Sequence, residues 1–175
     1  MRRLAFVFLA SWTCLALAQA EEERVVSKYT STARAKSLSY HESNDEDSEG
    51  FRGLFPGFGD YKLEHLGGDL RSWMNIRFRN ETVDLYVPTM KVGGGTFPHK
   101  ANDVVEWRGV ERQGHFTPYA LIYRIASSND DTRRTKTRLI VIKLDGERSA
   151  VIGHTEGANE DADAKALADR HRPPR

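Results

Sequence analysis

Apolar and polar residues alternate along much of the chain, most clearly over residues 69–79. One parity of this segment carries Leu70, Met74, Ile76 and Phe78, and the other carries Arg71, Asn75, Arg77 and Arg79. A period of two with one apolar face is typical of a strand that lies on a hydrophobic core. We therefore expect the apolar side chains to point inward and the polar ones to point outward.

The same alternation, interrupted by turn residues, predicts about seven strands in total. They span residues 61–66, 69–79, 82–87, 104–110, 119–126, 137–144 and 149–154. Short turns such as Gly67-Gly68-Asp69 and Asp145-Gly146 favour antiparallel hairpins. The nearly continuous apolar run over residues 139–142 predicts a central strand.

Near the C-terminus the apolar spacing changes to that of a helix, with Ala164, Leu167, Ala168 and His171 on one face. Asn159 suits the N-cap, and a pair of prolines at 173–174 ends the element. The fold class is therefore predicted to be α+β, a mainly antiparallel β-sheet of about seven strands with one C-terminal helix.

The N-terminal part of the chain has a different composition. Residues 21–50 are polar, with an acidic cluster over 42–49, and are predicted to form a flexible acidic arm in which residues 25–29 could pair as an edge strand. Residues 88–100, which include Gly93-Gly94-Gly95, are predicted to form a loop. The expected organisation is a signal peptide over 1–20, the arm over 21–50 and a single β-rich domain over 51–172.

The first twenty residues have the pattern of a secretory signal peptide. Arg2 and Arg3 precede an apolar run over 4–17, and Ala18-Gln19-Ala20 is a small-x-small cleavage site. The run is too short for a lasting transmembrane helix, so no integral membrane segment is expected after cleavage. The expected location is the periplasm or the extracellular medium. Because Cys14 is the single cysteine, the processed chain has no thiol and no disulfide.

The charge balance excludes one class of partner. The formal net charge of +1 becomes −1 once Arg2 and Arg3 are removed. A chain so close to neutral has no overall field that would attract nucleic acid, so a nucleic-acid partner is not expected.

No pattern in the sequence predicts a catalytic residue, a metal site or a cofactor. The acidic run at 45–50 resembles the start of a calcium loop, but Pro56 stands where the bidentate glutamate is needed. No G-x-S-x-G elbow is present, and no two histidines have metal-ligand spacing. A site assembled from the distant His99, His115 and His154 remains open, although isolated surface histidines are more common.

Two groups of residues are candidates for binding. Arg71, Trp73 and Arg77 share the outward parity of one strand, where an aromatic ring and guanidinium groups could contact a partner. Trp73, like Trp107, could instead lie buried beneath the C-terminal helix. Arg133 and Arg134 belong to a basic loop that could hold an anionic ligand. The expected function is non-catalytic binding of an envelope component or a protein partner; the alternative is a small envelope hydrolase with a site built from dispersed residues.

Several short segments together resemble a family of small exported proteins of unknown function from alphaproteobacteria. These segments are 56–61 (PGFGDY), 68–71 (GDLR), 105–108 (VEWR), 120–124 (ALIYR), 158–160 (ANE) and 166–170 (ALADR). Members of that family usually carry paired cysteines, where this chain has Phe55 and a position near Ala150, so the chain resembles a cysteine-free variant. The resemblance implies export from a Gram-negative cell and supplies no substrate, cofactor or catalytic residue.

The signal-peptide pattern predicts export and cleavage after Ala20. Intact-mass measurement of the exported protein is expected to give a chain that starts at Glu21. A mass that retains residues 1–20, or that includes a lipid on Cys14, would contradict this prediction.

Overall fold

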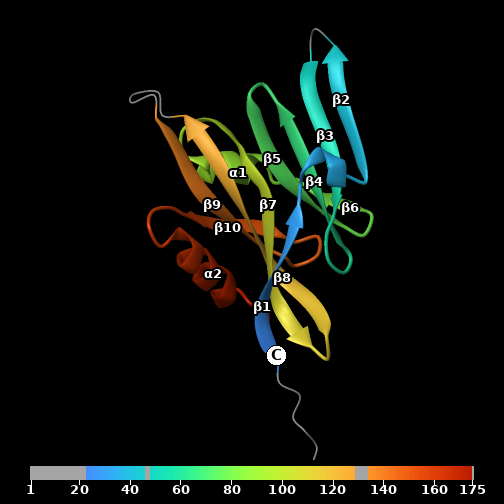
Figure 1. Ribbon diagram of the computed structural model, residues 1–175, viewed down its shortest axis with the longest axis vertical. Coiled ribbons are helices and arrows are strands. Elements are labelled where there is room, and N and C mark those ends of the chain that lie inside the picture. Colours follow the sequence, from blue (N-terminus) through green and yellow to red (C-terminus); the bar gives the residue numbers. More distant parts are fainter. Residues whose placement is uncertain (1–22, 46–47, 129–133, 175) are drawn as a thin grey trace, which may run out of the picture.

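The computed structural model describes residues 23–45, 48–128 and 134–174. The segment 1–20, on which the export prediction rests, lies outside these residues. Ten strands form two five-stranded sheets, in which every neighbouring pair is antiparallel (Figure 1). The mainly antiparallel α+β class is confirmed, whereas the predicted count of about seven strands is wrong.

The strands divide between the sheets in an order that follows the chain almost continuously. Sheet A has the order β1 (Arg24–Ser31), β7 (Thr96–Arg112), β8 (His115–Ser128), β9 (Thr135–Lys143) and β10 (Ala150–Thr155). Sheet B has the order β2 (Ser39–Asp45), β3 (Ser48–Pro56), β4 (Tyr61–Gly68), β5 (Arg71–Phe78) and β6 (Glu81–Val83). The prediction that residues 139–142 belong to a central strand is confirmed, because β9 lies between β8 and β10.

The predicted acidic arm contains strands of both sheets. Within it, β1 pairs with β7, a 3-10 turn (η1, Arg34–Lys36) follows, and β2 pairs with β3. Thr30 Oγ1 accepts a hydrogen bond of 2.8 Å from Trp107 Nε1, so β1 is tied to the core. The possible edge strand over residues 25–29 is confirmed, because β1 lies at the edge of sheet A. For β2, composition misleads because strand pairing satisfies backbone groups whatever the side chains are. Residues 21–22 and 46–47 lie outside the described residues.

The predicted loop over 88–100 contains a helix and the start of a strand. Helix α1 (Tyr86–Gly93) has Pro88 in its first turn and ends at Gly94, which adopts a left-handed φ of 62°. Proline is tolerated in a first helical turn, and a left-handed glycine is a common helix terminator. The glycines therefore end α1 rather than forming a flexible loop, and β7 begins at Thr96. The prediction of a single helix is accordingly wrong.

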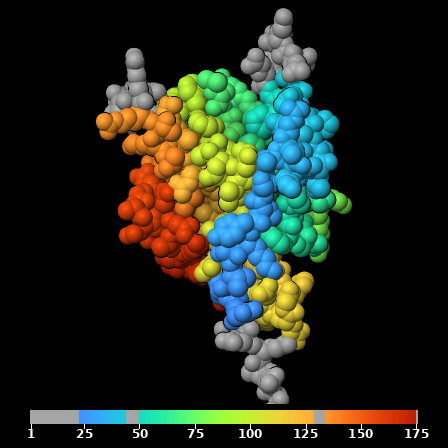
Figure 2. All heavy atoms as spheres, in the orientation of Figure 1, coloured from blue at the N-terminus to red at the C-terminus, as the bar shows by residue number. Residues whose placement is uncertain are grey.

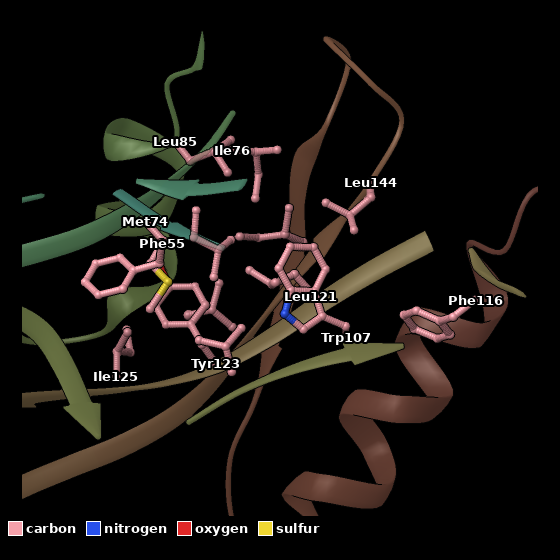
Figure 3. Close-up of a cluster of buried hydrophobic side chains, with 14 residues drawn as sticks. Phe55, Met74, Ile76, Leu85, Trp107, Phe116, Leu121, Tyr123, Ile125 and Leu144 are labelled. Atoms are coloured by element: carbon pink, nitrogen blue, oxygen red, sulfur yellow. The ribbon is translucent and has the colours of Figure 1, made fainter. Parts of the chain in front are cut away.

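Apolar side chains fill the space between the sheets. Figure 3 shows Phe55, Met74 and Ile76 of sheet B facing Trp107, Leu121 and Tyr123 of sheet A. The prediction that Met74 and Ile76 point inward is confirmed, since both are fully buried. Phe78 is only partly buried, beside Tyr61, and Leu70 is 75% exposed. Leu70 departs from the alternation because it lies in the β4–β5 turn with a φ of 62°.

Helix α2 (Glu160–Arg170) covers the outer face of sheet A, as Figure 1 shows. Its buried Ala164 and Ala168 pack on apolar residues of β8 and β9. Arg108 Nε and Nη2 donate to the two carboxylate oxygens of Asp169 at 2.9 and 2.8 Å. These hydrogen bonds lower the pKa of Asp169, although burial opposes the shift. The C-terminal helix predicted after Asn159 is confirmed.

Substitutions at two positions of the same parity distinguish the core from the turn. Because Met74 is fully buried, Met74→Ala is expected to lower the free energy of unfolding by about 2–5 kcal/mol. Leu70→Ala removes an exposed side chain and is expected to change it by no more than about 0.5 kcal/mol. Urea unfolding of both variants measures the difference, and equal losses would mean that the inward face of β5 is assigned wrongly.

Candidate functional site

A cleft of about 940 Å³ lies between the two sheets at the end where the inner positions of β4, β5 and β8 no longer carry large apolar residues. One wall comes from β2, β3, β4 and β5, and the other comes from the start of β7 and the end of β8. Figure 2 shows the green β4–β5 hairpin beside the yellow-green start of β7 at the upper end of the visible face. The backbone N–H of Lys100 donates to Ser72 Oγ at 2.8 Å and joins the two walls.

Aromatic rings form part of the sheet B wall. Phe51 stacks on Tyr40, with ring centroids 5.8 Å apart, and meets His65 edge-on at 4.7 Å. A side chain at position 67 could not be accommodated, because an added Cβ would lie 2.2 Å from the Phe51 ring. Gly67 therefore allows Phe51 to lie across β4 and gives the cleft a flat apolar surface.

His65 is a buried titratable group in this wall. Its exposed fraction is 5%, and its Nε2 has no hydrogen-bond partner among the described residues. Burial and, to a smaller extent, the positive charge of Lys100 lower the pKa of His65 to about 3, although the Asp103 carboxylate opposes the shift. The imidazole is therefore neutral at physiological pH and adds hydrogen-bonding capacity rather than charge.

Arg71 and Phe97 build the mouth of the cleft. The Arg71 guanidinium lies over the Phe97 ring, 4.8 Å from its centroid. Arg71 Nη1 donates to the carbonyl oxygen of Asp69 at 3.2 Å and also to the Asp69 carboxylate. His99 Nδ1 donates to the carbonyl oxygen of Phe97 at 3.0 Å. One aromatic residue thus positions both a cation and an imidazole.

Lys100 has a structural role beside these residues. Its ammonium donates to Thr32 Oγ1 at 3.0 Å, to the carbonyl oxygen of Thr32 at 3.3 Å and to the Asp103 carboxylate. An ammonium has three N–H groups, so these contacts use its donor capacity. Lys100 therefore fixes β7 to the segment after β1 and supplies positive charge near His65.

Three non-glycine residues at the mouth have left-handed backbone conformations. The φ angles are 49° at Asp69, 62° at Leu70 and 51° at Phe97. Such conformations are uncommon for residues with a side chain and cost roughly 1–2 kcal/mol each. Strain of this kind is concentrated at functional sites, so it favours the cleft as the functional region.

The structure separates the predicted binding residues. Arg71 reaches the cleft, whereas Trp73 packs edge-on against Tyr86 of α1, with ring centroids 4.7 Å apart. Arg77 lies 3.8 Å from the carboxylate of Glu64, which is 2% exposed and also accepts from Arg52. Arg77 therefore has a structural partner on the outer face of sheet B.

The other expectations about these side chains have different outcomes. Trp73 and Trp107 do not lie beneath α2, because Trp73 contacts α1 and Trp107 belongs to the core between the sheets. Arg134 is exposed just before β9 and does not line the cleft, while Arg133 lies outside the described residues. Phe51, His65 and Phe97 were not predicted as site residues. Their only signal was the inward parity of Phe51 and His65, which the register of β3 and β4 was needed to interpret.

A polar network beneath α2 has a structural explanation. Asp169 accepts from both Arg108 and Tyr119, while Ser27 donates to the carboxylate of Glu106, which lies 3.8 Å from Lys165. Each contact either joins the helix to sheet A or joins β1 to β7. The network therefore accounts for the attachment of α2.

Within residues 23–45, 48–128 and 134–174, no group of three or more His, Cys, Asp or Glu side chains is arranged to hold a metal ion. The three-histidine site that the sequence left open is accordingly not formed there. Neither α1 nor α2, in the part of the chain that the structure describes, is long and apolar enough to cross a membrane.

Comparison with known proteins adds no relative to these observations. No protein-family model matches the chain, and neither the curated proteins nor the solved structures give a significant match.

The buried His65 predicts a pH dependence of stability. Its folded-state pKa of about 3 lies below the ordinary value of 6.5, so the unfolded chain binds the proton first as the pH falls. This contribution is fully present above about pH 6.5 and weakens below it by up to roughly 1.4 kcal/mol per pH unit. Urea unfolding between about pH 7 and pH 4.5 gives the free energy of unfolding as a function of pH. We expect this free energy to fall less steeply with decreasing pH in His65→Gln than in the unaltered protein. The exposed His41→Gln is the control, and identical slopes in all three proteins would contradict the assignment.

Proposed function

We propose that this protein is a non-catalytic binding domain of the cell envelope and that its ligand occupies the cleft between the two sheets. The observation that carries the proposal is the cleft itself, with its aromatic wall, its buried His65 and its strained mouth. A volume of about 940 Å³ lies within the range of small-molecule sites.

The composition of the cleft supports binding of a small molecule. Phe51 and Phe97 offer apolar area, while Arg71, His99 and His65 offer a few polar groups at defined positions. This combination is typical of ligand pockets, in which apolar walls provide affinity and a small number of polar groups fix orientation. Arg71 remains in the proposed site, while Trp73 and Arg77 do not, because Trp73 packs against Tyr86 and Arg77 lies beside the Glu64 carboxylate.

Location in the envelope is a separate part of the proposal. It rests on the signal-peptide pattern over residues 1–20 and on the resemblance to small exported alphaproteobacterial proteins. A protein released into the periplasm or the medium would meet envelope components directly, which favours such a component as the occupant of the cleft.

Native mass spectrometry tests whether a small molecule binds in the cleft. The protein is exported, purified without detergent and incubated with a low-molecular-weight extract of the cell envelope. We expect an added mass that disappears under denaturing conditions. His99→Trp places a large ring at the cleft wall and should abolish the added mass, because His99 lines the cleft and is exposed.

His41→Trp is the matched control, since His41 is an exposed residue of β2 that does not line the cleft. It should retain the ligand. Absence of any added mass in the unaltered protein, or equal binding by both variants, would overturn the proposed site. Turnover of an extract component by the purified protein would favour the hydrolase alternative.

A further inference from the structure

We infer that the cleft binds an anionic amphiphile, with a carboxylate or phosphate headgroup on Arg71 and an apolar body along Phe51, Phe97 and Leu70. The inference rests on the proposed function, because it names the ligand class of the same cleft. It depends on which hydrogen-bonding groups and which apolar surfaces of the cleft remain unused.

Arg71 has an unused edge that suits an anion. Its hydrogen bonds to Asp69 both come from Nη1, and Nε and Nη2 make none to the described residues. The Nε–Nη2 edge is one that can bind a carboxylate or phosphate through two parallel hydrogen bonds. The Phe97 ring beneath the guanidinium fixes the orientation of the guanidinium plane, so the Nε–Nη2 edge is already oriented for binding.

The ion pair between Arg71 and Asp69 does not prevent such binding. The Asp69 side chain is 83% exposed, whereas that of Arg71 is 28% exposed. An exposed ion pair of this kind contributes only about 0–1 kcal/mol. A ligand carboxylate on the unused edge would therefore gain a charge-assisted contact without breaking a strong one.

The electrostatics of the cleft favour an anion over a cation. Besides Asp69, Glu42 is the carboxylate among the described residues that line the cleft, and it accepts a hydrogen bond of 2.8 Å from Arg34. The Lys100 ammonium is paired with the Asp103 carboxylate and the buried His65 is neutral, so Arg71 is the charged group of the described cleft lining that keeps unused N–H donors. A ligand cation would meet no such unused group, because the carboxylates of Glu42 and Asp69 are already paired with Arg34 and Arg71.

Three apolar side chains line the same cleft as Arg71. Leu70 is 75% exposed in a turn conformation that is unfavourable for a branched apolar side chain, and Phe97 has a similar left-handed φ. Phe51 provides the flat surface opposite the start of β7. An acyl chain that covered these side chains would remove apolar area from water, with a gain of about 25 cal/mol per Å².

Isothermal titration calorimetry with decanoate, decyl phosphate, decanol and decyltrimethylammonium as monomeric probes tests the headgroup. We expect the protein to bind the two anions, decanol more weakly and the cation least. Arg71→Gln should weaken decanoate binding about ten- to a hundredfold and leave decanol binding unchanged, because only the charge-assisted contact is lost. Leu70→Ser should weaken decanoate and decanol alike.

Arg79→Gln is the matched control. Arg79 also lies in a β-hairpin turn, over a phenylalanine ring (Phe78, 5.1 Å) and beside an aspartate (Asp60, 2.9 Å), but it does not line the cleft. It should leave all affinities unchanged. Unaltered decanoate affinity in Arg71→Gln, or equal affinity of the unaltered protein for decanoate and decanol, would overturn the anion assignment.

A vesicle arm distinguishes a free amphiphile from a membrane lipid headgroup. Co-sedimentation with phosphatidylglycerol vesicles, but not phosphatidylcholine vesicles, together with Arg71 dependence, would identify the membrane as the source. Monomer binding without sedimentation would identify a free amphiphile. If the protein binds neither the anionic amphiphiles nor the phosphatidylglycerol vesicles, the inference is overturned. The proposed function still stands in that case if the unaltered protein binds a ligand from the extract and His99→Trp does not. If His99→Trp binds decanoate as tightly as the unaltered protein does, the amphiphile does not occupy the cleft, and both the inference and the proposed site are overturned.

Discussion

The apolar core fills only one end of the space between the two sheets. The position at which the core ends determines where the cleft lies. The inner positions of β4 run from Leu63 through His65 to Gly67, and those of β5 run from Ile76 through Met74 to Ser72. Large apolar residues thus give way to small or polar ones at the same end of neighbouring strands. Sheet A changes in the same direction, from Leu121 and Ile125 to Ser127 on β8. Small residues cannot fill the gap between the sheets, so the cleft follows directly from this gradient.

The outer faces of the sheets are stabilised differently. Helix α2 covers sheet A through small buried alanines, together with the Arg108–Asp169 ion pair. On sheet B, the Glu64 carboxylate lies almost fully buried and is neutralised by Arg52 and Arg77. Removing one partner of a buried charge is costly because the other charge is left without compensation. These arginines are therefore required by the fold, which leaves Arg71 as the arginine of β5 with hydrogen-bonding capacity for a ligand.

Local patterns in the sequence predicted those elements whose own side chains specify a buried face. Three such elements were predicted correctly: the strand around Met74, the apolar strand β9 and the helix after Asn159. Strands β2 and β3 were missed because their polar and glycine residues resemble an arm and a turn, although pairing partners stabilise them. The cleft could not be predicted, because it depends on the register that brings Phe51 to Gly67 and on the contact between Lys100 and Ser72.

Leu70 is the residue at the cleft mouth whose conformation and exposure favour a functional explanation over a structural one. Arg79 and Gln113 also adopt left-handed conformations in short hairpin turns, but both side chains are polar and lie in water without penalty. A leucine in the same situation has an unfavourable backbone conformation and also leaves its side chain 75% exposed. Neither cost is recovered by packing in the folded chain. Both would be offset once a ligand covered the side chain, because the strained turn already presents it beside Arg71.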